Sequence, residues 1–444
     1  MFYHIRPRVA GANCPGAAEH PVRPPYNGTT TNQPDDSIDN GNKSQAITLA
    51  IKISSKLAQV KPSPTMAVTA LAAELRAQGR DVIGLGAGEP DFDTPDHIKD
   101  AAIEAINSGQ TKYTAVDGIA ELKNAIVGKF KNDNHIDYNV GELLVSCGGK
   151  QSFFNLAQAV LDDGDEVVIP APYWVSYPDI VLIAGGTPVF VDTTQEQAFK
   201  VSPQQLDEAM TDNTRLVVLN SPSNPSGKSY TLEEMKGLGE VLRQYPDAII
   251  ATDDMYEHIV WSEEGFCNLL NACPDLHERT VVMNGVSKAY AMTGWRIGYA
   301  GGPEPVIAAM RKIQSQSTSN PTSVSQWASV AALTGGNDCI APMLSAFKER
   351  HDFVVASLND MKGVSCIESD GTFYAFPNVQ SAIESNNEVN NDVEFSSWVL
   401  DKAGVAIVPG SAFGTEGHVR LSFATSTENL EKAMSRMGDL LNAG

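Results

Sequence analysis

Hydrophobic residues recur along the chain with two different periods, which predict helices and strands in alternation. Residues 151–161 predict a helix with one apolar face, because hydrophobic residues recur there at the spacing i, i+3, i+4, i+7 and i+8. They are Phe153, Leu156, Ala157, Val160 and Leu161. Near-continuous apolar runs, typical of strands that are covered on both faces, occupy residues 165–172, 215–222, 248–254, 280–285 and 296–302. Strands of this kind, separated by helical segments, predict an α/β fold with a mostly parallel sheet.

The C-terminal part of the chain has a different pattern. It predicts two helices and two strands, the helices at residues 347–361 and 427–443 and the strands at residues 371–379 and 418–425. Thr425 and Glu428 have the spacing of a capping box at the start of the last helix. The apolar face of that helix consists of Leu430, Ala433, Met434, Met437, Leu440 and Leu441. These elements predict a smaller α+β domain after the larger one.

Residues 1–46 differ from the rest because they are rich in Pro, Asn, Asp, Gly and Thr, and we predict a disordered N-terminal extension. Arg6 and Arg8 leave open a presequence for a plastid or mitochondrion, although Pro7 and Pro15 disfavour an amphipathic helix. We therefore expect a cytoplasmic location, or an organelle if this segment is a targeting signal.

Composition and charge limit the function classes. The 444 residues are 42% hydrophobic and 19% charged, as in globular proteins with a large core. A net charge of −22 argues against nucleic acid or an anionic membrane as a partner, since both attract a basic face. The six cysteines form no CxxC pair, so we expect free thiols and no metal site. No apolar run approaches the ~20 residues that span a bilayer, which favours a soluble intracellular protein.

Three polar residues follow apolar strands: Asn224, Asp253 and Lys288. The carboxyl ends of parallel strands form the ligand-binding edge of an open sheet. Alone, these residues could be a turn former, a helix N-cap and a solvated charge. Together they suit pyridoxal 5′-phosphate, because Lys288 would form a Schiff base and Asp253 would pair with the pyridinium nitrogen. Tyr256 and Asn224 could then hydrogen-bond the ring hydroxyl.

The phosphate of this cofactor requires its own donors. Gly148, Gly149 and Lys150 precede the helix predicted over residues 151–161, and the free N–H groups at a helix start favour an anion. Arg296 can add a bidentate charged contact. We therefore predict a phosphate site at this helix start.

A family resemblance extends from about residue 52 to the end of the chain. The segments that carry it are KPSPTMAV, GLGAGEPDFDTP, KYTAVDGIAELK, GGKQ, APYWVSYP, NSPSNPSG, DDMYEH, SKAYAMTGWRIGYAGGP, QSQSTS, GTFYAF, VPGSAFG and HVRLSFATS. They are similar to the class I pyridoxal-phosphate-dependent aminotransferases, in the branch of bacterial-type aspartate and aspartate/prephenate aminotransferases. The resemblance implies fold type I and a homodimer with shared active sites. It also implies a large cofactor-binding domain at residues 95–325 and a small domain formed by residues 47–94 and 326–444.

The same resemblance implies roles for further residues. Trp174 would stack on the cofactor ring, and Tyr113 would reach the phosphate in the neighbouring subunit's site. Arg420 would bind the substrate α-carboxylate as a fork, helped by the backbone of Gly88. Trp174 and Asn224 would also contact the substrate.

Dicarboxylate substrates require a second cation for the distal carboxylate. In one branch of the family a partner arginine supplies it, but the corresponding segment QSQSTSN has no arginine. The aspartate/prephenate branch uses Lys150 and the KPSPT segment, notably Ser63 and Thr65. These residues favour aspartate, glutamate and 2-oxoglutarate.

The implied reaction is ping-pong transamination between aspartate or glutamate and 2-oxoglutarate or oxaloacetate, with Lys288 as the general base. Prephenate as the amino acceptor, alone or as part of a dual specificity, stays open. A pyridoxal-phosphate lyase or decarboxylase would share Lys288, Asp253 and Arg420. A nicotinamide-binding loop is disfavoured because Glu89 follows the glycines of GLGAG where a helix should begin.

The sequence departs from the family pattern at three positions. Ser226 stands where the usual motif has threonine, Asp254 where close relatives have glutamate, and Gly285 where some relatives have a phosphate-binding serine. The departure at Gly285 puts the phosphate contacts in doubt.

Overall fold

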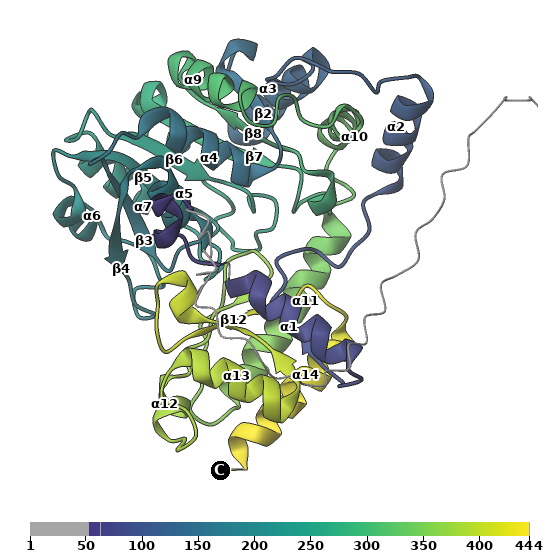
Figure 1. The fold of residues 1–444 in the computed structure, drawn as a ribbon, viewed down its shortest axis with the longest axis vertical. Coiled ribbons are helices and arrows are strands. Elements are labelled where there is room, and N and C mark those ends of the chain that lie inside the picture. Colours follow the sequence, from purple (N-terminus) through teal and green to yellow (C-terminus); the bar gives the residue numbers. More distant parts are fainter. Residues whose placement is uncertain (1–52, 63, 444) are drawn as a thin grey trace, which may run out of the picture. The chain divides into compact units, whose positions relative to one another are not determined.

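A seven-stranded sheet dominates the computed structural model, which describes residues 53–62 and 64–443 (Figure 1). Its strand order is β2-β8-β7-β6-β5-β3-β4. The strands are β2 (Leu143–Ser146), β3 (Glu166–Ala171), β4 (Thr187–Asp192), β5 (Thr214–Asn220), β6 (Ile249–Asp253), β7 (Thr280–Gly285) and β8 (Gly298–Gly301). β8 runs antiparallel to both of its neighbours, β2 and β7, and the other four strand pairs of this sheet are parallel. The prediction of an α/β fold with a mostly parallel sheet is confirmed.

Helices cover both faces of this sheet, because consecutive strand side chains point to opposite sides. In β3, Val167 and Ile169 belong to one apolar cluster and Val168 to another. The first cluster includes side chains of α4 (Gly149–Val160), α5 (Ser176–Ala184) and α9 (Glu304–Ser315). The second includes side chains of α3 (Ala120–Asn134), α6 (Pro203–Ala209), α7 (Leu232–Leu242) and α8 (Leu269–Ala272). Burial on both sides explains why the strands are continuous apolar runs.

Two small sheets lie outside the large one. The first has the order β11-β12-β9 and is antiparallel, and the second pairs β1 with β10 in parallel. Their strands are β1 (Ile83–Gly84), β9 (Tyr374–Ala375), β10 (Val405–Ala406), β11 (Val408–Pro409) and β12 (Val419–Ser422). The C-terminal helices are α11 (Ala341–Asn359), α12 (Gln380–Glu384), α13 (Asp392–Ala403) and α14 (Thr427–Asn442), and Figure 1 shows α11, α13 and α14 grouped around β12.

The remaining elements connect these parts. The other α-helices are α1 (Pro64–Ala77), α2 (Asp96–Asn107) and α10 (Ser323–Thr334). The short 3-10 helices are η1 (Ser55–Gln59), η2 (Val140–Glu142), η3 (Pro274–Arg279), η4 (Thr293–Trp295) and η5 (Gly410–Phe413). The large sheet is formed within residues 95–325. The two-stranded sheet joins residues 47–94 to residues 326–444, and the three-stranded sheet lies within residues 326–444. The division into domains at these boundaries stays a prediction, and the extension predicted at residues 1–46 lies outside the described residues.

The start of α14 differs from the prediction. Ser426 is its N-cap and accepts a hydrogen bond from the backbone N–H of Asn429, whereas Thr425 accepts one from the Asn429 side chain. The predicted capping box of Thr425 and Glu428 is therefore wrong, because the cap and the residue whose N–H it accepts each lie one position later in the chain. The predicted apolar face is buried except at Leu440, which is partly buried.

Several strand boundaries also differ from the prediction. Within residues 371–379 only the two residues of β9 form a strand, and Pro377 lacks the N–H that a longer ladder requires. The strand predicted from residue 296 begins at Gly298, because Arg296 has a left-handed backbone with φ of 57°. The edge strand β4 escaped the apolar-run pattern since most of its side chains are only partly covered.

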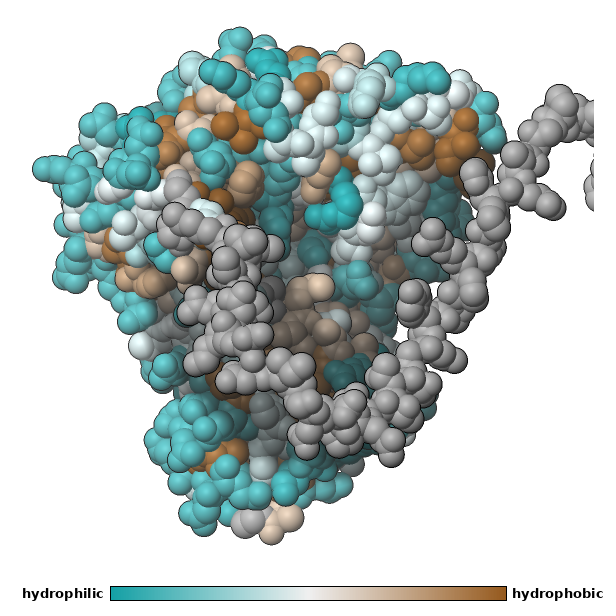
Figure 2. Space-filling model, viewed as in Figure 1, coloured by the Kyte–Doolittle hydropathy of each residue, from teal (hydrophilic) through white to brown (hydrophobic). Residues whose placement is uncertain are grey.

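One face of the molecule is largely polar, in keeping with the excess of acidic residues. Hydrophilic residues cover much of the face in Figure 2, and the hydrophobic residues among them form separate groups. No helix in residues 53–62 and 64–443 is long and apolar enough to cross a membrane.

Candidate active site

A cavity of about 480 Å³ lies at the carboxyl ends of β5, β6 and β7. Most of the predicted site residues line it: Thr65, Gly88, Gly149, Lys150, Trp174, Asn224, Asp253, Tyr256, Lys288, Arg296 and Arg420. They come from distant parts of the sequence and from both the large sheet and the small ones. The fold therefore brings together residues that the sequence analysis selected separately.

Lys288 enters the cavity from the turn that follows β7. Its Nζ donates a hydrogen bond to the carbonyl oxygen of Gly88. Desolvation is the main cause that lowers the pKa of Lys288 to about 8, and the nearby cations Arg420 and Arg296 lower it further. The residue is half-buried, since it faces the cavity. A substantial fraction of this amine is therefore neutral near pH 8, and a neutral amine can act as a nucleophile and a base.

Asp253 is the last residue of β6 and is held by two donors. Its Oδ2 accepts a hydrogen bond of 2.5 Å from the hydroxyl of Tyr177, and its Oδ1 accepts one of 3.3 Å from the backbone N–H of Met255. Burial raises the pKa of Asp253, and the two donors offset part of that rise. The carboxylate thus has a fixed orientation next to the cavity, where it could pair with a cationic group of a bound ligand.

Tyr177 was not selected from the sequence, although a signal was present. It lies three residues after Trp174 in the YWVSY segment, which leads into the start of α5. The rings of Trp174 and Tyr177 form an edge-to-face contact with their centroids 5.2 Å apart. One segment therefore supplies both an aromatic wall of the cavity and the donor to Asp253.

Arg420 on β12 is buried and largely fixed. Its Nη1 donates to Oδ1 of Asn224 at 2.9 Å, and its Nη2 donates to the carbonyl oxygen of Gly86 at 2.7 Å. Its guanidinium lies 4.4 Å from the ring centroid of Tyr374, while its buried Nε has no hydrogen-bond partner among the described residues. A buried cation with an unused donor beside a cavity suits an anionic ligand.

Tyr374 on β9 is a second residue that the sequence analysis did not select. Its hydroxyl lies 3.0 Å from the hydroxyl of Tyr256, so the loop after β6 of the large sheet and the three-stranded sheet meet at the cavity wall. Burial is the largest cause that raises the pKa of Tyr256, so its hydroxyl stays protonated. A Cβ at Gly88 would lie 2.6 Å from the Tyr374 hydroxyl, which explains why this position requires glycine.

The predicted phosphate site consists of two glycines packed against Arg296. Gly148 is the N-cap of α4 with φ of 88°, and Gly149 is the first residue of the helix. A Cβ at Gly148 would overlap the Arg296 guanidinium, and one at Gly149 would overlap the terminal methyl of Met255. The glycines therefore leave the helix N–H groups and the guanidinium open to the same small space, which suits a phosphate.

Lys150 directly follows this cradle as the second residue of α4, and it also lines the cavity. Its Nζ is 5.2 Å from the ring centroid of Trp174. Burial and the charge of Arg296 lower the pKa of Lys150, in this order. Thr65 at the start of α1 also lines the cavity, and its buried hydroxyl has no hydrogen-bond partner in the described ranges.

Two predicted residues in the described part of the chain, Gly148 and Tyr113, are not among the residues that line this cavity, although Gly148 packs against Arg296, which does. The side chain of Tyr113 is 93% exposed and lies outside the set of lining residues. Ser63 lies outside the described residues. Their predicted roles, and those of the residues above, stay predictions.

The departures from the family pattern have local explanations. The buried Asp254 accepts a hydrogen bond from Asn268 and does not line the cavity, and burial raises the pKa of its carboxyl. A Cβ at Gly285 would lie 3.0 Å from the carbonyl oxygen of Ile297, so the backbone leaves little room for a serine. Ser287 lines the cavity and offers a hydroxyl two residues later.

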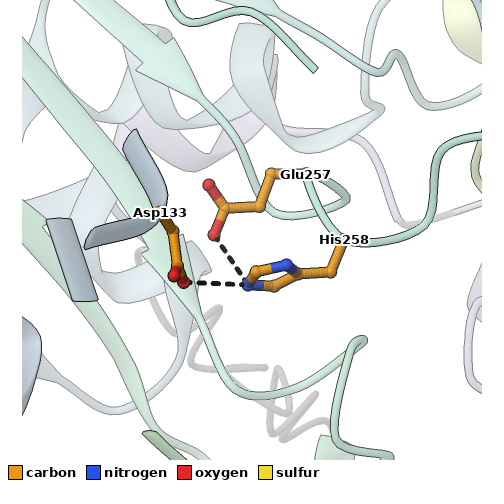
Figure 3. A group of neighbouring side chains, drawn as sticks. All are labelled: Asp133, Glu257 and His258. Carbon is orange, nitrogen blue, oxygen red and sulfur yellow. Dashed lines mark ion pairs between the residues drawn. The ribbon is translucent and has the colours of Figure 1, made fainter. Parts of the chain in front are cut away.

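Charged residues behind the cavity anchor the loop that carries Tyr256. Figure 3 shows Nε2 of His258 between Asp133 and Glu257, at 3.6 Å and 3.2 Å from their carboxylate oxygens. The Lys129 ammonium is ion-paired with Glu257, and both side chains are buried. Because Lys129 already supplies the positive charge, we assign the group to a structural charge network rather than to a metal site.

The cavity residues fit pyridoxal phosphate in the chemistry of their donors. Four groups surround one space: a partly neutral lysine, a carboxylate with a fixed orientation, two glycines packed against a guanidinium, and a buried arginine with an unused donor. Lys288 suits the aldehyde, Asp253 the ring nitrogen, and Gly149 with Arg296 the phosphate.

Comparisons with known proteins agree with this chemistry. The family described as "Aminotransferase class I and II" matches residues 80–437. The chain is 62% identical over 397 residues to an aspartate/prephenate aminotransferase from Nitrosomonas europaea, which covers 88% of this chain and 100% of that protein. An aspartate aminotransferase from Rhizobium meliloti has a TM-score of 0.86 and 45% identity, covering 88% of this chain and 99% of that one. An aspartate aminotransferase from Thermus thermophilus with maleate has a TM-score of 0.83 and 42% identity, covering 88% and 100%.

Proposed function

The chain belongs to the class I and II aminotransferases, which use pyridoxal 5′-phosphate, and we propose that its substrates are aspartate or glutamate with 2-oxoglutarate or oxaloacetate. One observation carries the substrate choice. The cavity contains Arg420, which can bind an α-carboxylate, and separately Lys150, which can bind a distal carboxylate. A substrate with two carboxylates would match both cations. Maleate, the molecule named with the Thermus thermophilus enzyme, is also a dicarboxylate.

The cofactor and the protein have distinct tasks. Bound pyridoxal phosphate supplies an aldehyde that condenses with amines and a ring that accepts electrons from the substrate α-carbon. Lys288 would hold this aldehyde and, as a free amine, would take the proton from the substrate α-carbon. Its pKa of about 8 suits this task, because a base is most effective when its pKa lies near the working pH.

The other residues orient the reactants. Asp253 keeps the ring nitrogen protonated, and the Tyr177 hydroxyl fixes the carboxylate oxygen that is not engaged by the backbone of Met255. Asn224 holds one arm of the Arg420 fork, so the substrate α-carboxylate meets a guanidinium that is already oriented. Because the guanidinium is ordered before the substrate binds, less entropy is lost when the reactive arrangement forms.

The same cavity serves both half-reactions, which implies ping-pong kinetics. The amino acid binds and leaves as a 2-oxo acid before the second 2-oxo acid binds at the same cations. Initial rates at several fixed concentrations of the second substrate test this order. Parallel double-reciprocal lines support the proposal, and intersecting lines contradict it.

Prephenate is a second candidate acceptor. The relative from Nitrosomonas europaea, at 62% identity, is named for both aspartate and prephenate. Prephenate also carries two carboxylates, which Arg420 and Lys150 could bind. A panel of acceptors that includes 2-oxoglutarate, oxaloacetate, prephenate and phenylpyruvate distinguishes a single from a dual specificity.

We further propose a homodimer in which each subunit contributes to the other's site. The support is Tyr113, an aromatic side chain that is 93% exposed although its predicted role is to reach a phosphate. Exposed aromatic residues of this kind are typical of protein interfaces. Sedimentation at several concentrations tests the dimer, and a stable monomer with full activity contradicts it.

A further inference from the structure

The loop between Lys288 and β8 contains two non-glycine residues with left-handed backbone conformations. Ala291 has φ of 49° and Arg296 has φ of 57°. This conformation is unfavourable for residues with a Cβ, so the surroundings must hold it in place. The loop begins at the predicted aldehyde-binding lysine and ends at the predicted phosphate-binding arginine.

Thr94, far away in the sequence, joins the two halves of this loop. Its Oγ1 donates a hydrogen bond of 2.6 Å to the carbonyl oxygen of Ala291 and accepts one of 2.9 Å from Nε1 of Trp295. The Thr94 hydroxyl therefore donates one hydrogen bond and accepts another, and its two partners flank the turn. Neither Thr94 nor Trp295 lines the cavity.

The loop conformation determines where the Arg296 guanidinium lies. Its Nη1 donates to the carbonyl oxygen of Thr293 at 2.8 Å, so the side chain folds back over its own loop. The guanidinium then packs against Gly148 so closely that a Cβ there would overlap it. A shift at residues 291–296 would move the charge away from the glycine cradle.

We propose that Thr94 is a positioning residue that holds Arg296 in place for the phosphate of the cofactor. This inference rests on the proposed function, because it assumes that Gly148 and Arg296 form the phosphate site. Thr94 acts through the loop and does not touch the cofactor. Its loss should weaken binding of a phosphate monoester and leave binding of the same molecule without its phosphate unchanged.

The test compares two ligands on the full-length protein after removal of its cofactor. Pyridoxal 5′-phosphate and pyridoxal are titrated against the wild type, Thr94→Val and Thr94→Ser. Valine keeps the shape of threonine without the hydroxyl, and serine restores the hydroxyl. Thr334→Val serves as the matched control, because the exposed Thr334 hydroxyl donates to the carbonyl oxygen of Val330 in its own helix and, among the described residues, joins no other segment.

We expect Thr94→Val to weaken pyridoxal phosphate binding roughly five- to tenfold, as for a lost hydrogen bond. Pyridoxal affinity should not change, and both Thr94→Ser and Thr334→Val should match the wild type. In an Arg296→Gln background, Thr94→Val should add less than twofold, because the charge that it positions is gone.

Three results would overturn the proposal: no loss with Thr94→Val, an equal loss for both ligands, or a full additional loss in the Arg296→Gln background. If Thr94→Val does not fold, Trp295→Phe removes the same hydrogen bond from the other side, and the same three criteria apply. The wild type separates this inference from the proposed function. If the wild type does not bind pyridoxal phosphate, the proposed function fails, whereas normal wild-type binding with an unaffected variant refutes only the role of Thr94.

Discussion

The hydroxyl of Tyr177 donates a hydrogen bond of 2.5 Å to Oδ2 of Asp253, while the Tyr177 ring packs edge-to-face against Trp174, an aromatic wall of the cavity. This bond lowers the pKa of Asp253 against the rise that burial causes. Asp253 is useful to a protonated ring only as a carboxylate. The Tyr177 hydroxyl therefore extends the range of pH over which the site can work.

Tyr177→Phe should reduce kcat roughly tenfold to a hundredfold, since a hydrogen bond to a charged group contributes about 1.5–3 kcal/mol. The pKa of Asp253 should rise in this variant. When the pH is lowered, the variant should therefore lose activity at a higher pH than the wild type does. A pH profile of kcat measures both effects. Tyr173→Phe is the control, because the Tyr173 ring stacks on Phe190 away from Asp253. An unchanged acid limb in Tyr177→Phe would refute this coupling.

The rate at which the cofactor-free protein captures pyridoxal phosphate should depend on the protonation of Lys288. Its lowered pKa of about 8 means that the reactive neutral amine increases as the pH rises through 8 and is lost below it. Stopped-flow absorbance should therefore show a rate that rises and then levels off above this pH. A rate that rises only near the ordinary lysine pKa would contradict the desolvated environment.

Lys288→Ala supplies the matching covalent test. The variant should still bind the cofactor through Asp253 and the phosphate cradle but should lose transamination. Borohydride reduction followed by peptide mass spectrometry should attach the cofactor to Lys288 in the wild type and to no residue in the variant. Full activity of the variant would remove Lys288 from the account.

Lys150→Ser should separate two uses of the Lys150 ammonium, which lies against Trp174. If it binds the distal carboxylate, kcat/KM for aspartate and glutamate should fall roughly tenfold to a hundredfold, the scale of a lost charged hydrogen bond. Tyrosine and phenylalanine should lose much less. Equal losses for both classes would mean that Lys150 serves the phosphate cradle instead.

The buried ion pair behind the cavity should be important for stability. Lys129→Met would leave the Glu257 carboxylate buried without its cation, which costs about 3–5 kcal/mol in the free energy of unfolding. Lys131→Met in the same helix is the control, since its pair with Asp137 is exposed and should contribute less than about 1 kcal/mol. Urea denaturation measures both variants. Similar losses would show that burial of the pair is unimportant.

The sequence predicted those parts of the molecule that depend on local pattern. Residues at the carboxyl ends of strands, such as Asp253 and Lys288, could be placed together because parallel strands end at one edge of a sheet. The glycine pair at 148–149 could be placed at a helix start for the same kind of reason. In each case a short segment carries both the backbone signal and the functional side chain.

What the sequence could not predict depends on contacts between distant segments. Tyr374 reaches Tyr256 only because β9 packs beside the cavity, and Tyr177 carries the apolar signature of any buried helix residue. Thr94 has its role through a loop about two hundred residues away. The capping error at Thr425 arose because the serine that follows it can also cap a helix.

The central claim is that this chain transfers an amino group between dicarboxylates. The most direct measurement incubates the purified protein and pyridoxal phosphate with nitrogen-15 aspartate and 2-oxoglutarate and follows the products by mass spectrometry. The account predicts nitrogen-15 glutamate and oxaloacetate in equal amounts, without free ammonia. Release of labelled ammonia or of carbon dioxide in the absence of 2-oxoglutarate would contradict it.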